Sequence, residues 1–440
     1  MATQANIPGG LAEKISQRTA KVGVLGLGYV GLPTIVATAS NGFRVVGLDI
    51  DQDRVDRINA GNSYIEDVQT ATLTSLVDKG IVSATTDFAM VRDMDIIMIC
   101  VPTPVNSHKE PELTALQDAV HALAKQMEGE QLVVLQSTTY PGTTEEMVLP
   151  QLEATGRRVG QEFYLAFSPE RIDPGNPQYQ IHNIPKVVGG VTPQCGDMAV
   201  AFFSTFVDQV ISVGSPKVAE MTKLLENIFR SVNIALVNEL AQLCNRMDID
   251  IWELIKAAST KPFGFMPFHP GVGVGGHCIP VDPFYLSWKA KEFDFYPNFI
   301  ELAARTNDNM PYYATSRIVD ILGETGMPVR GCNLLLLGLS FKKDIGDTRN
   351  SPALRVADLL ADRGALVSYS DPHVPQVAVG GRTLTSLDLD EATVKGQDAT
   401  IILVDHSLYD LAKVVDNSKL VIDTTDSTRP LGTRANVVKL

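Results

Sequence analysis

The chain has 440 residues, of which 45% are hydrophobic and 20% charged, and its formal net charge is −14. At roughly 100–200 residues per domain, this length predicts two or three globular domains. The acidic balance argues against binding to nucleic acid or to anionic membranes, because both need a basic surface. The longest apolar stretches are strand-length, far below the roughly 18 residues of a membrane span.

Residues 1–20 form an N-terminal leader without an apolar run long enough for a signal peptide. We therefore expect a cytoplasmic protein that begins with a loose leader. The five cysteines show no CxxC pair and no Cys/His cluster; they are Cys100, Cys195, Cys244, Cys278 and Cys332. This spacing predicts no metal site, and most of these thiols should be small buried hydrophobes.

Short β-type runs alternate with helical stretches over residues 21–210. The runs are residues 21–27, 44–49, 95–100 and 131–136. Alternation of this kind predicts a parallel, doubly wound α/β sheet. We therefore expect a Rossmann domain in this part of the chain.

A GxGxxG fingerprint, GLGYVG, lies between the first expected strand and the helix after it. Gly26 permits the tight turn, Gly28 lets the backbone approach a pyrophosphate, and Gly31 allows close helix–strand packing. Asp49 ends the next strand, where a carboxylate accepts ribose hydroxyls and repels a 2′-phosphate. This favours NAD, although the nearby Arg54 would soften the preference; the alternative is a glycine-rich turn without a ligand. The predicted cofactor contacts here are Gly26, Gly28, Tyr29, Val30, Gly31, Asp49 and Arg54.

Residues 217–247 contain neither Pro nor Gly, and their apolar residues recur at helical spacing. They predict one helix on the order of 45 Å long, and residues 286–306 also read as mostly helical. Strand signals return at residues 333–339, 366–370, 400–404 and 420–423. The predicted fold is therefore two Rossmann-like doubly wound α/β domains joined by a long central helix, with a central helical region at 211–312 and a C-terminal domain at 313–440.

The segment GVGGHCIPVDP, residues 273–283, is a glycine-rich loop that ends at a cysteine. Glycines remove side chains, so such a loop can wrap a ligand closely. Cys278 is the predicted nucleophile, because a thiolate is the reactive form; the alternative is a buried structural thiol. His277 would tune the thiol, contact substrate or be structural, and we favour the structural role. Asp282 would reach the same pocket if the segment turns.

Two polar residues follow strands of the first domain. Thr138 lies in the STTYPGTT segment and Glu170 follows residues 163–167. Strand C-termini face the ligand crevice of a doubly wound sheet, so both residues are candidates for the site. The alternatives are a turn or helix cap for Thr138 and a solvated surface carboxylate for Glu170.

Lys223 and Asn227 share one face of the long helix. A cation and an amide aimed together would stabilise an oxyanion. The alternative is a surface lysine paired with Glu220 or Glu226.

Seven motifs occur in order along the chain: GLGYVGLP, CVPTP, STTYPGTT, SPERIDPG, KLLEN, GGHCIPVDP and GLSFKKDIGDTRNSP. With them the sequence resembles the UDP-glucose/UDP-mannose dehydrogenase family of nucleotide-sugar 6-dehydrogenases over nearly its full length. The resemblance implies an N-terminal NAD domain, a central helical dimer contact and a C-terminal UDP-binding domain. It thus implies a UDP-sugar substrate and a homodimer or higher homo-oligomer.

The same resemblance implies residue roles. Cys278 is the nucleophile, Lys223 and Asn227 hold the oxyanion, Glu170 and Thr138 handle water for thioester hydrolysis, and Asp282 supports general-base chemistry. It adds cofactor contacts at Pro102, Thr103, Thr138 and Arg349. The implied substrate contacts are Glu170, Arg171, Lys223, Asn227, Gly273, Gly275, Gly276, Phe341 and Lys342. One departure is Val281, where some relatives carry Lys, so this position receives no essential role.

The implied chemistry is a four-electron oxidation of the sugar C6 alcohol. C6 first loses a hydride to NAD⁺, and the Cys278 thiolate then captures the aldehyde. A second hydride loss leaves a thioester, which water hydrolyses to the acid. The segment TKPFGF and the form GGHCIPVDP resemble the N-acetylhexosamine branch, which favours UDP-N-acetyl-D-glucosamine.

Several readings stay open at this point. UDP-N-acetylmannosamine, UDP-N-acetylgalactosamine and UDP-glucose are alternative substrates. A two-electron hydroxyacid or sugar-phosphate dehydrogenase would share the fold without needing Cys278, and a catalytically silent nucleotide-binding regulator would need no turnover at all. Polysaccharide precursor synthesis is the expected role of the product.

Overall fold

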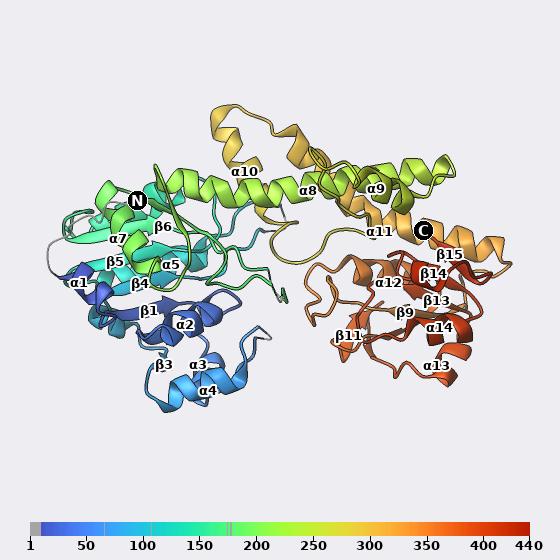
Figure 1. Cartoon of the computed structure of the whole chain (residues 1–440), viewed down its shortest axis with the longest axis horizontal. Helices are drawn as coiled ribbons and strands as arrows, with labels where there is room; N and C mark the ends of the chain where they lie inside the picture. Colours follow the sequence, from blue (N-terminus) through green and yellow to red (C-terminus); the bar gives the residue numbers. More distant parts are fainter. Residues whose placement is uncertain (1–9, 66, 107, 174, 177) are drawn as a thin grey trace. The chain divides into compact units, whose positions relative to one another are not determined.

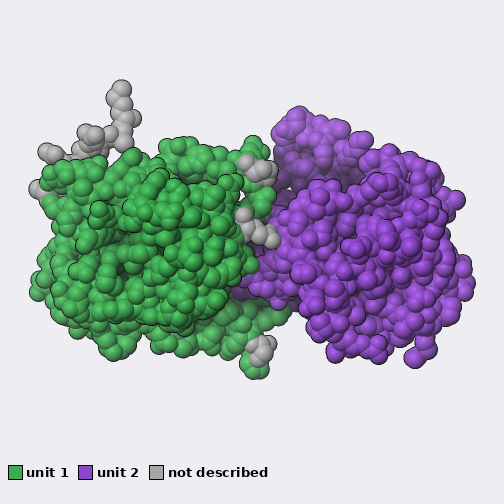
Figure 2. Space-filling model, turned by 90° about the horizontal axis from the view of Figure 1, so that it is seen from below, with its two compact units in different colours: residues 1–226, 284–295 green, residues 227–283, 296–440 purple. Residues whose placement is uncertain are grey.

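The structure is a computed structural model that describes residues 10–65, 67–106, 108–173, 175–176 and 178–440. The chain divides into two compact units, coloured separately in Figure 2. The first contains residues up to Glu226 and Phe284–Phe295; the second contains Asn227–Pro283 and Tyr296–Leu440. Among the described residues, no helix is both long and apolar enough to cross a membrane.

The first unit is built on an eight-stranded sheet with the order β3-β2-β1-β4-β5-β6-β7-β8. Its strands are β1 (Lys21–Leu25), β2 (Arg44–Leu48), β3 (Val82–Thr85), β4 (Ile96–Ile99), β5 (Gln131–Leu135), β6 (Phe163–Phe167), β7 (Lys186–Gly190) and β8 (Val210–Val213). Neighbouring strands are parallel except β6 and β7, which pair antiparallel. The expected doubly wound domain is confirmed, with the direction reversed for the last two strands.

The connection between β6 and β7 explains the reversal. A parallel pair needs a crossover, usually a helix, whereas an antiparallel pair does not. The described part of residues 168–185 contains no helix. The chain can therefore pass from β6 into an antiparallel β7 without a crossover helix. The alternation of strand and helix signals in the sequence does not predict this change of strand direction.

Helices cover the first sheet on both faces (Figure 1). They are α1 (Leu11–Ser16), α2 (Gly31–Ser40), α3 (Gln52–Asn59), α4 (Thr70–Asp78), α5 (Thr114–Gln126), α6 (Leu149–Glu153) and α7 (Pro193–Phe203), with short turns η1 (Phe88–Asp93), η2 (Thr144–Val148) and η3 (Lys291–Phe293). Alternate residues of β4 enter opposite cores: Ile96 and Met98 lie in one, Ile97 and Ile99 in the other. Both faces are thus buried, as in other doubly wound sheets.

Part of the expected loose leader is folded. Helix α1 buries Leu11 and Ile15 in the core of the first domain. Residues 11–16 therefore belong to that domain, and this correction arises because two apolar side chains one helical turn apart form a small amphipathic face. Residues 1–9 of the leader lie outside the described residues.

The long helix α8 runs over Pro216–Arg246 without interruption, and the boundary between the units falls within it. The predicted central helix is confirmed to within one residue at each end. The second prediction, that residues 286–306 are mostly helical, is confirmed, although the segment is divided: α10 (Asp282–Ala290) ends before α11 (Asn298–Glu324) begins. Asp294 adopts a left-handed conformation and Pro297 caps α11, and a proline favours starting a new helix over continuing one.

The second unit carries a five-stranded parallel sheet with the order β10-β9-β13-β14-β15. Its strands are β9 (Asn333–Leu337), β10 (Leu366–Ser370), β13 (Ala399–Ile402), β14 (Val421–Asp423) and β15 (Val437–Lys439), beside a hairpin of β11 (Gln376–Val379) and β12 (Arg382–Thr385). Its helices are α9 (Ile251–Ala258), α12 (Pro352–Asp362), α13 (Glu391–Lys395) and α14 (Leu411–Asn417), with the turn η4 (Arg429–Leu431). This confirms the second α/β domain. The strand order reverses between β9 and β13, which marks the carboxyl edge there as a ligand crevice.

Candidate active site

The glycine fingerprint forms the turn from β1 into α2. Gly26 has a φ of 91°, and a Cβ atom there would lie 2.7 Å from the carbonyl oxygen of Cys100. A Cβ atom at Gly31 would lie 1.8 Å from the carbonyl oxygen of Gly26. A Cβ atom at Gly28 would meet nothing within 4 Å. Two glycines are thus required by packing, and the third leaves open space before the helix N-terminus, where a pyrophosphate fits.

Asp49 follows β2 and is only 6% exposed. Its Oδ2 accepts a hydrogen bond from the Leu27 amide at 2.7 Å, and its Oδ1 accepts one from the Asp51 amide at 3.0 Å. The carboxylate therefore fixes the glycine turn, a role in addition to the predicted contact with the ribose. Arg54 lies 3.4 Å from Oδ2, so the predicted neighbour is present.

The segments after β4 and β5 meet within the first unit. The Thr103 hydroxyl donates to the Thr138 carbonyl at 2.7 Å, and Pro102 precedes Thr103 in the same loop. The Tyr285 hydroxyl donates to the carbonyls of Thr103 and Pro104. Tyr285 is completely buried. Sequence reasoning missed it; the only signal was an aromatic residue shortly after the cysteine motif.

Glu170 is held by a buried lysine that sequence reasoning also missed. Lys186, at the start of β7, lies 2.9 Å from Glu170 Oε2, and the two side chains are 6% and 12% exposed. Glu170 Oε1 accepts from the amides of Arg171 and Ile172 at 2.7 and 2.9 Å. Burial favours the neutral acid, but Lys186 and these amides outweigh it and hold the pKa of Glu170 below its usual value. Glu170 is therefore an ionised carboxylate.

The acidic neighbours of Lys223 are bonded elsewhere. Glu220 is buried and accepts from the amides of Gly142 and Thr144. Glu226 pairs with Arg171, whose guanidinium approaches one carboxylate oxygen to 2.6 Å. The simple surface ion pair considered for Lys223 is thus not formed with either residue. Arg171, a predicted substrate contact, forms an ion pair with Glu226.

In the second unit, Cys278 differs from the other cysteines. The other four are buried, whereas Cys278 is partly exposed. Its Sγ lies 3.0 Å from His277 Nδ1. Of the three roles considered for His277, this contact supports tuning of the thiol, because a ring nitrogen at hydrogen-bond distance can exchange a proton with the sulfur.

The backbone after Cys278 turns directly into α10. The Cys278 carbonyl accepts from the amides of Val281 and Asp282 at 3.0 and 2.8 Å. Asp282, buried at the start of α10, accepts a 2.5 Å hydrogen bond from Asn227 Nδ2 on α8. Asn227 therefore links α8 to the cysteine turn, a role in addition to the predicted contact with an oxyanion.

The glycine-rich loop packs against its own unit. A Cβ atom at Gly273 would lie 2.9 Å from Pro352, and at Gly275 or Gly276 it would lie 2.6 or 2.9 Å from Phe341. We expected these glycines to make room for a ligand; in the structure they make room for Phe341 and Pro352. The predicted substrate contacts at these positions and at Phe341 thus form one packed surface, with Lys342 next in sequence.

Arg349 is tied to the same loop. Its carbonyl accepts from the Gly276 amide at 3.0 Å, and its guanidinium binds the Asp347 carboxylate at 2.9 and 2.6 Å. Burial opposes ionisation of Asp347, but Arg349 outweighs it and lowers the pKa of that carboxyl.

A cavity of about 440 Å³ lies elsewhere in the first unit, between α2, the start of α4 and the described residues between Ile172 and His182. The described residues that line it include Asp67, Asp173 and His182 but neither Lys nor Arg. A diphosphate prefers amides and cations, so the open space at Gly28 fits the cofactor better.

Sequence models of one protein family match three parts of the chain. The UDP-glucose/GDP-mannose dehydrogenase family matches with its NAD-binding domain at residues 20–207, its central domain at 217–309 and its UDP-binding domain at 335–430. The resemblance seen in the motifs is confirmed, and the family description names GDP-mannose as its second nucleotide sugar.

Individual relatives agree with this. The chain is 39% identical to "UDP-N-acetyl-D-glucosamine 6-dehydrogenase" of Pseudomonas aeruginosa, over 80% of this chain and 83% of the relative. It is 37% identical to "UDP-N-acetyl-D-mannosamine dehydrogenase" of Pyrococcus horikoshii, over 88% and 89%. A solved structure of UDP-D-ManNAc dehydrogenase from Pyrococcus horikoshii superposes with a TM-score of 0.83 at 33% identity, covering 92% of this chain and 94% of that one. The chain therefore belongs to the UDP-glucose/GDP-mannose dehydrogenase family and is an NAD-dependent UDP-sugar 6-dehydrogenase.

Proposed function

We propose that the protein oxidises the C6 alcohol of UDP-N-acetyl-D-glucosamine to a carboxylate in two steps, with Cys278 as covalent nucleophile. The observation that carries this proposal is the environment of Cys278. It is the partly exposed thiol among five described cysteines, and it contacts His277 at 3.0 Å. A nucleophile must be reachable, and a base beside it can take its proton; partial exposure and the neighbouring imidazole support both conditions for this thiol.

The chain's own groups carry the chemistry between two oxidations. Bound NAD⁺ would accept the hydride from C6 in each of them. The Cys278 thiolate adds to the C6 aldehyde, forming a C–S bond and an alkoxide. Loss of hydride from that adduct gives a thioester, and water then displaces the thiolate to leave the carboxylate. Per sugar, one water is consumed, two NADH are formed and three protons are released.

Charge at the reacting carbon would be handled by α8 and by Glu170. Lys223 and Asn227 lie one helical turn apart, and we propose that they stabilise the alkoxide, an effect typically worth about 2.7–4 kcal/mol per donor. Glu170 is ionised because its ion pair with Lys186 outweighs the effect of burial and keeps its pKa below the usual value. We propose that this carboxylate, with Thr138, orients and deprotonates the hydrolytic water, while Asp282 assists through its bond to Asn227.

The choice of sugar rests on motifs and relatives. The relatives that match at 39% and 37% carry names for UDP-N-acetyl-D-glucosamine and UDP-N-acetyl-D-mannosamine respectively. Both are 2-acetamido sugars, which favours an acetamido substrate over UDP-glucose. Of these two sugars, the TKPFGF segment favours UDP-N-acetyl-D-glucosamine. An acidic glycan precursor is the product this implies.

The test is a panel of UDP-sugars with NAD⁺, in which NADH formed per sugar is counted and the product is identified by mass. We expect two NADH per UDP-N-acetyl-D-glucosamine and slower turnover of the manno, galacto and gluco analogues. One NADH per sugar would support a two-electron dehydrogenase instead. No turnover with any sugar would support a nucleotide-binding protein without activity.

We also propose a homodimer formed through α8. Exposed apolar side chains recur along this helix at steps of three, four and seven residues: Val218, Met221, Leu225, Phe229, Leu236, Leu240 and Leu243. An apolar stripe of this length is typical of a helix-packing surface. Light scattering on the wild type and on Leu240→Asp tests it: a dimer should become a monomer, and a wild-type monomer would refute it.

A further inference from the structure

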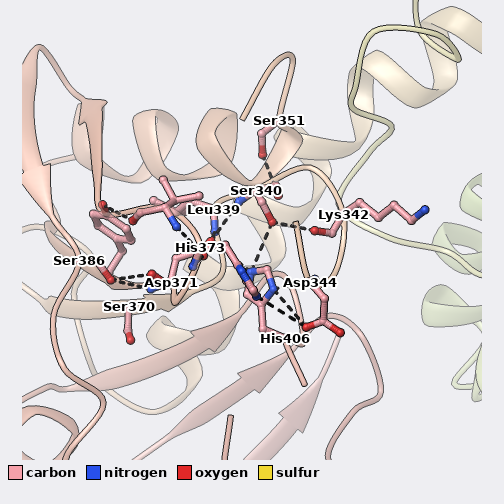
Figure 3. A network of polar contacts seen from close by, with 12 residues as sticks. Leu339, Ser340, Lys342, Asp344, Ser351, Ser370, Asp371, His373, Ser386 and His406 are labelled. Carbon is pink, nitrogen blue, oxygen red and sulfur yellow. Dashed lines mark hydrogen bonds and ion pairs between the residues drawn. The ribbon is translucent and has the colours of Figure 1, made fainter. Parts of the chain in front are cut away.

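A polar network with a buried centre lies at the carboxyl ends of β9, β10 and β13 in the second unit (Figure 3). Its centre is Asp371 and His406, whose side chains are both 0% exposed. We call these two residues and their partners Ser340 and Asp344 the Asp371–His406 network. It occupies the carboxyl edge of the second sheet where the strand order reverses, between β9 and β13, which is where sheets of this kind bind ligands.

Asp371 ties the loop after β10 to the loop after β9. Its Oδ2 accepts from the amides of Leu339 and Ser340 at 2.7 and 3.2 Å. Its Oδ1 accepts from the His373 and Val374 amides at 2.8 and 3.1 Å. Burial opposes ionisation, but these donors and His406 outweigh it and lower the pKa of Asp371. The carboxylate is therefore charged and fully bonded.

His406 closes the network from the loop after β13. Its Nδ1 accepts from the Asp344 amide at 2.9 Å, and its Nε2 lies 3.2 Å from Asp371 Oδ2. Since an acceptor nitrogen carries a lone pair, the ring proton belongs on Nε2 and is donated to Asp371. The Asp344 N–H therefore points at Nδ1 and the Nε2 proton points at Asp371, and these two bonds hold the ring in one orientation.

These bonds fix both ends of one short segment, residues 339–344. Asp371 holds its first two amides and His406 holds its last. Inside the segment, the Ser340 hydroxyl donates to the Lys342 carbonyl at 2.8 Å, and the Phe341 amide donates to the Asp347 carbonyl at 2.9 Å. The backbone that presents Phe341 and Lys342 is thus constrained at nearly every residue.

We propose that Asp371 and His406 are positioning residues for the uridine diphosphate part of the substrate. They hold residues 339–344 so that Phe341 and Lys342 are ordered before the nucleotide arrives. A segment ordered in advance loses less conformational entropy on binding, which raises affinity without any new contact. This inference rests on the proposed function, in which Phe341 and Lys342 contact the UDP-sugar.

A metal site is the competing explanation for part of this network. Ligand atoms of Asp344, His373 and His406 lie within 4.8 Å of one another. However, the Nδ1 lone pair of His406 already accepts the Asp344 amide. Both carboxylate oxygens of Asp344 accept from Ser407, its amide at 2.7 Å and its hydroxyl at 2.6 Å. Hydrogen bonds therefore already occupy His406 Nδ1 and both carboxylate oxygens of Asp344, and of the three residues only His373 offers a ring nitrogen, Nε2, without a hydrogen-bond partner.

The test compares variants of His406 with a matched control in the full-length protein. His406→Gln keeps a donor toward Asp371 but loses the acceptor for Asp344, and His406→Asn keeps an acceptor near Nδ1 but cannot reach Asp371. Tyr409→Phe is the control. It removes a 2.7 Å hydrogen bond to the Ser370 carbonyl beside the His406 ring, outside residues 339–344. Asp371→Asn serves as a second variant if the His406 variants do not fold.

Binding of UDP and of NAD⁺ is measured separately by calorimetry, and KM for each substrate is measured alongside kcat. We expect both His406 variants to weaken UDP binding about tenfold and to raise KM for the UDP-sugar alone. NAD⁺ affinity should change less than about twofold, and Tyr409→Phe should lower the melting temperature without changing UDP affinity.

Three results would overturn the inference. The first is wild-type UDP affinity in folded His406 and Asp371 variants. The second is an equal loss of UDP and NAD⁺ affinity, which a purely structural role would produce. The third is loss of UDP affinity in EDTA with recovery on Zn²⁺ addition, which would establish a metal site. If the wild type itself does not bind UDP, the proposed function fails, and that outcome is distinct from all three.

Discussion

In both sheets an aspartate after one strand accepts hydrogen bonds from the loop after the neighbouring strand, but the two loops differ in what they leave open to a ligand. In the first, Asp49 follows β2 and accepts the Leu27 amide at 2.7 Å; in the second, Asp371 follows β10 and accepts the Leu339 amide at 2.7 Å. Each aspartate also accepts the amide two residues further on. The glycine before each leucine has a positive φ, 91° at Gly26 and 79° at Gly338. The two units thus share a local design that their sequences, GLGY and GLSF, only partly reveal.

The surroundings of the two aspartates differ in the space and the hydrogen-bond acceptors that they leave for a ligand. Beside Asp49 stands the half-exposed Arg54, and Gly28 faces empty space. Beside Asp371 stands the buried His406, and Ser340 replaces the second glycine. The first carboxylate keeps lone pairs for a ligand, whereas the second is occupied by the protein. One framework therefore serves a dinucleotide site in one unit and a fixed segment in the other.

The largest effect is expected from a substitution of Cys278 in the second unit, which should nearly abolish acid production and spare NAD⁺ binding. Cys278→Ser should reduce acid production by at least about 10³-fold, because a neutral hydroxyl is a poor nucleophile for the aldehyde. NAD⁺ affinity should stay close to wild type, since Cys278 is not among the predicted cofactor contacts and all of these except Arg349 belong to the first unit. Product mass and NAD⁺ calorimetry check this. Wild-type turnover in the variant would eliminate the covalent mechanism.

The next effect concerns the carboxylate after β6. Glu170→Gln should slow hydrolysis about 10²-fold, because the amide cannot accept a proton from water. A covalent adduct on Cys278 should then accumulate and be seen by intact-protein mass spectrometry. Lower activity with no adduct would show that Glu170 acts at another step.

Lys186 sets the pH range over which Glu170 works. Since Lys186 keeps the pKa of Glu170 below its usual value, the active carboxylate persists to acidic pH in the wild type. Lys186→Met should raise that pKa, so the acid limb of the hydrolysis rate should move to higher pH. A pH–rate profile with the limb unmoved would argue that Lys186 has only a structural role.

The aspartates themselves should respond differently. Asp49→Asn should weaken NAD⁺ binding about tenfold and narrow the preference over NADP⁺, because the charge that repels a 2′-phosphate is lost. The matched variant Asp371→Asn should leave both dinucleotide affinities unchanged. Equal responses of the two variants would end the distinction drawn between the sheets.

The smallest effect on cofactor binding is expected from replacing Gly28, the second glycine of the first loop, by the serine found at the matching position of the second loop. Gly28→Ser gives the first loop the residue that the second loop has. Because the Cβ position is open, the melting temperature should change by about 1 °C or less, while NAD⁺ affinity should fall about fivefold. A large drop in melting temperature would mean that Gly28, like Gly31, is needed for packing.

Local signals were sufficient to predict much of this molecule. Periodicity predicted α8 and both α/β domains, and the fingerprint predicted the turn after β1 with Gly26 and Gly28 in it and Gly31 at the start of the next helix. The reversal at β7 and the break before Pro297 were missed, because strand direction and helix continuity depend on connections rather than on composition. The roles proposed for the site residues stay predictions.

Contacts between distant parts of the chain were not predictable. Lys186 reaches Glu170, Tyr285 reaches Thr103, and Asn227 reaches Asp282. None of these pairs has a spacing that a sequence pattern could register. The glycine-rich loop was recognised, but its glycines accommodate Phe341 and Pro352, and only three-dimensional packing shows this.

The uneven burial of the five thiols has a practical consequence. Iodoacetamide should alkylate the folded enzyme once, at Cys278, because the other four cysteines are shielded. The same accessibility exposes this sulfur to peroxide, which converts a thiolate to a sulfenic acid and then irreversibly to higher oxides. Loss of activity during storage would therefore trace to a single atom, and a thiol reductant added early would protect it.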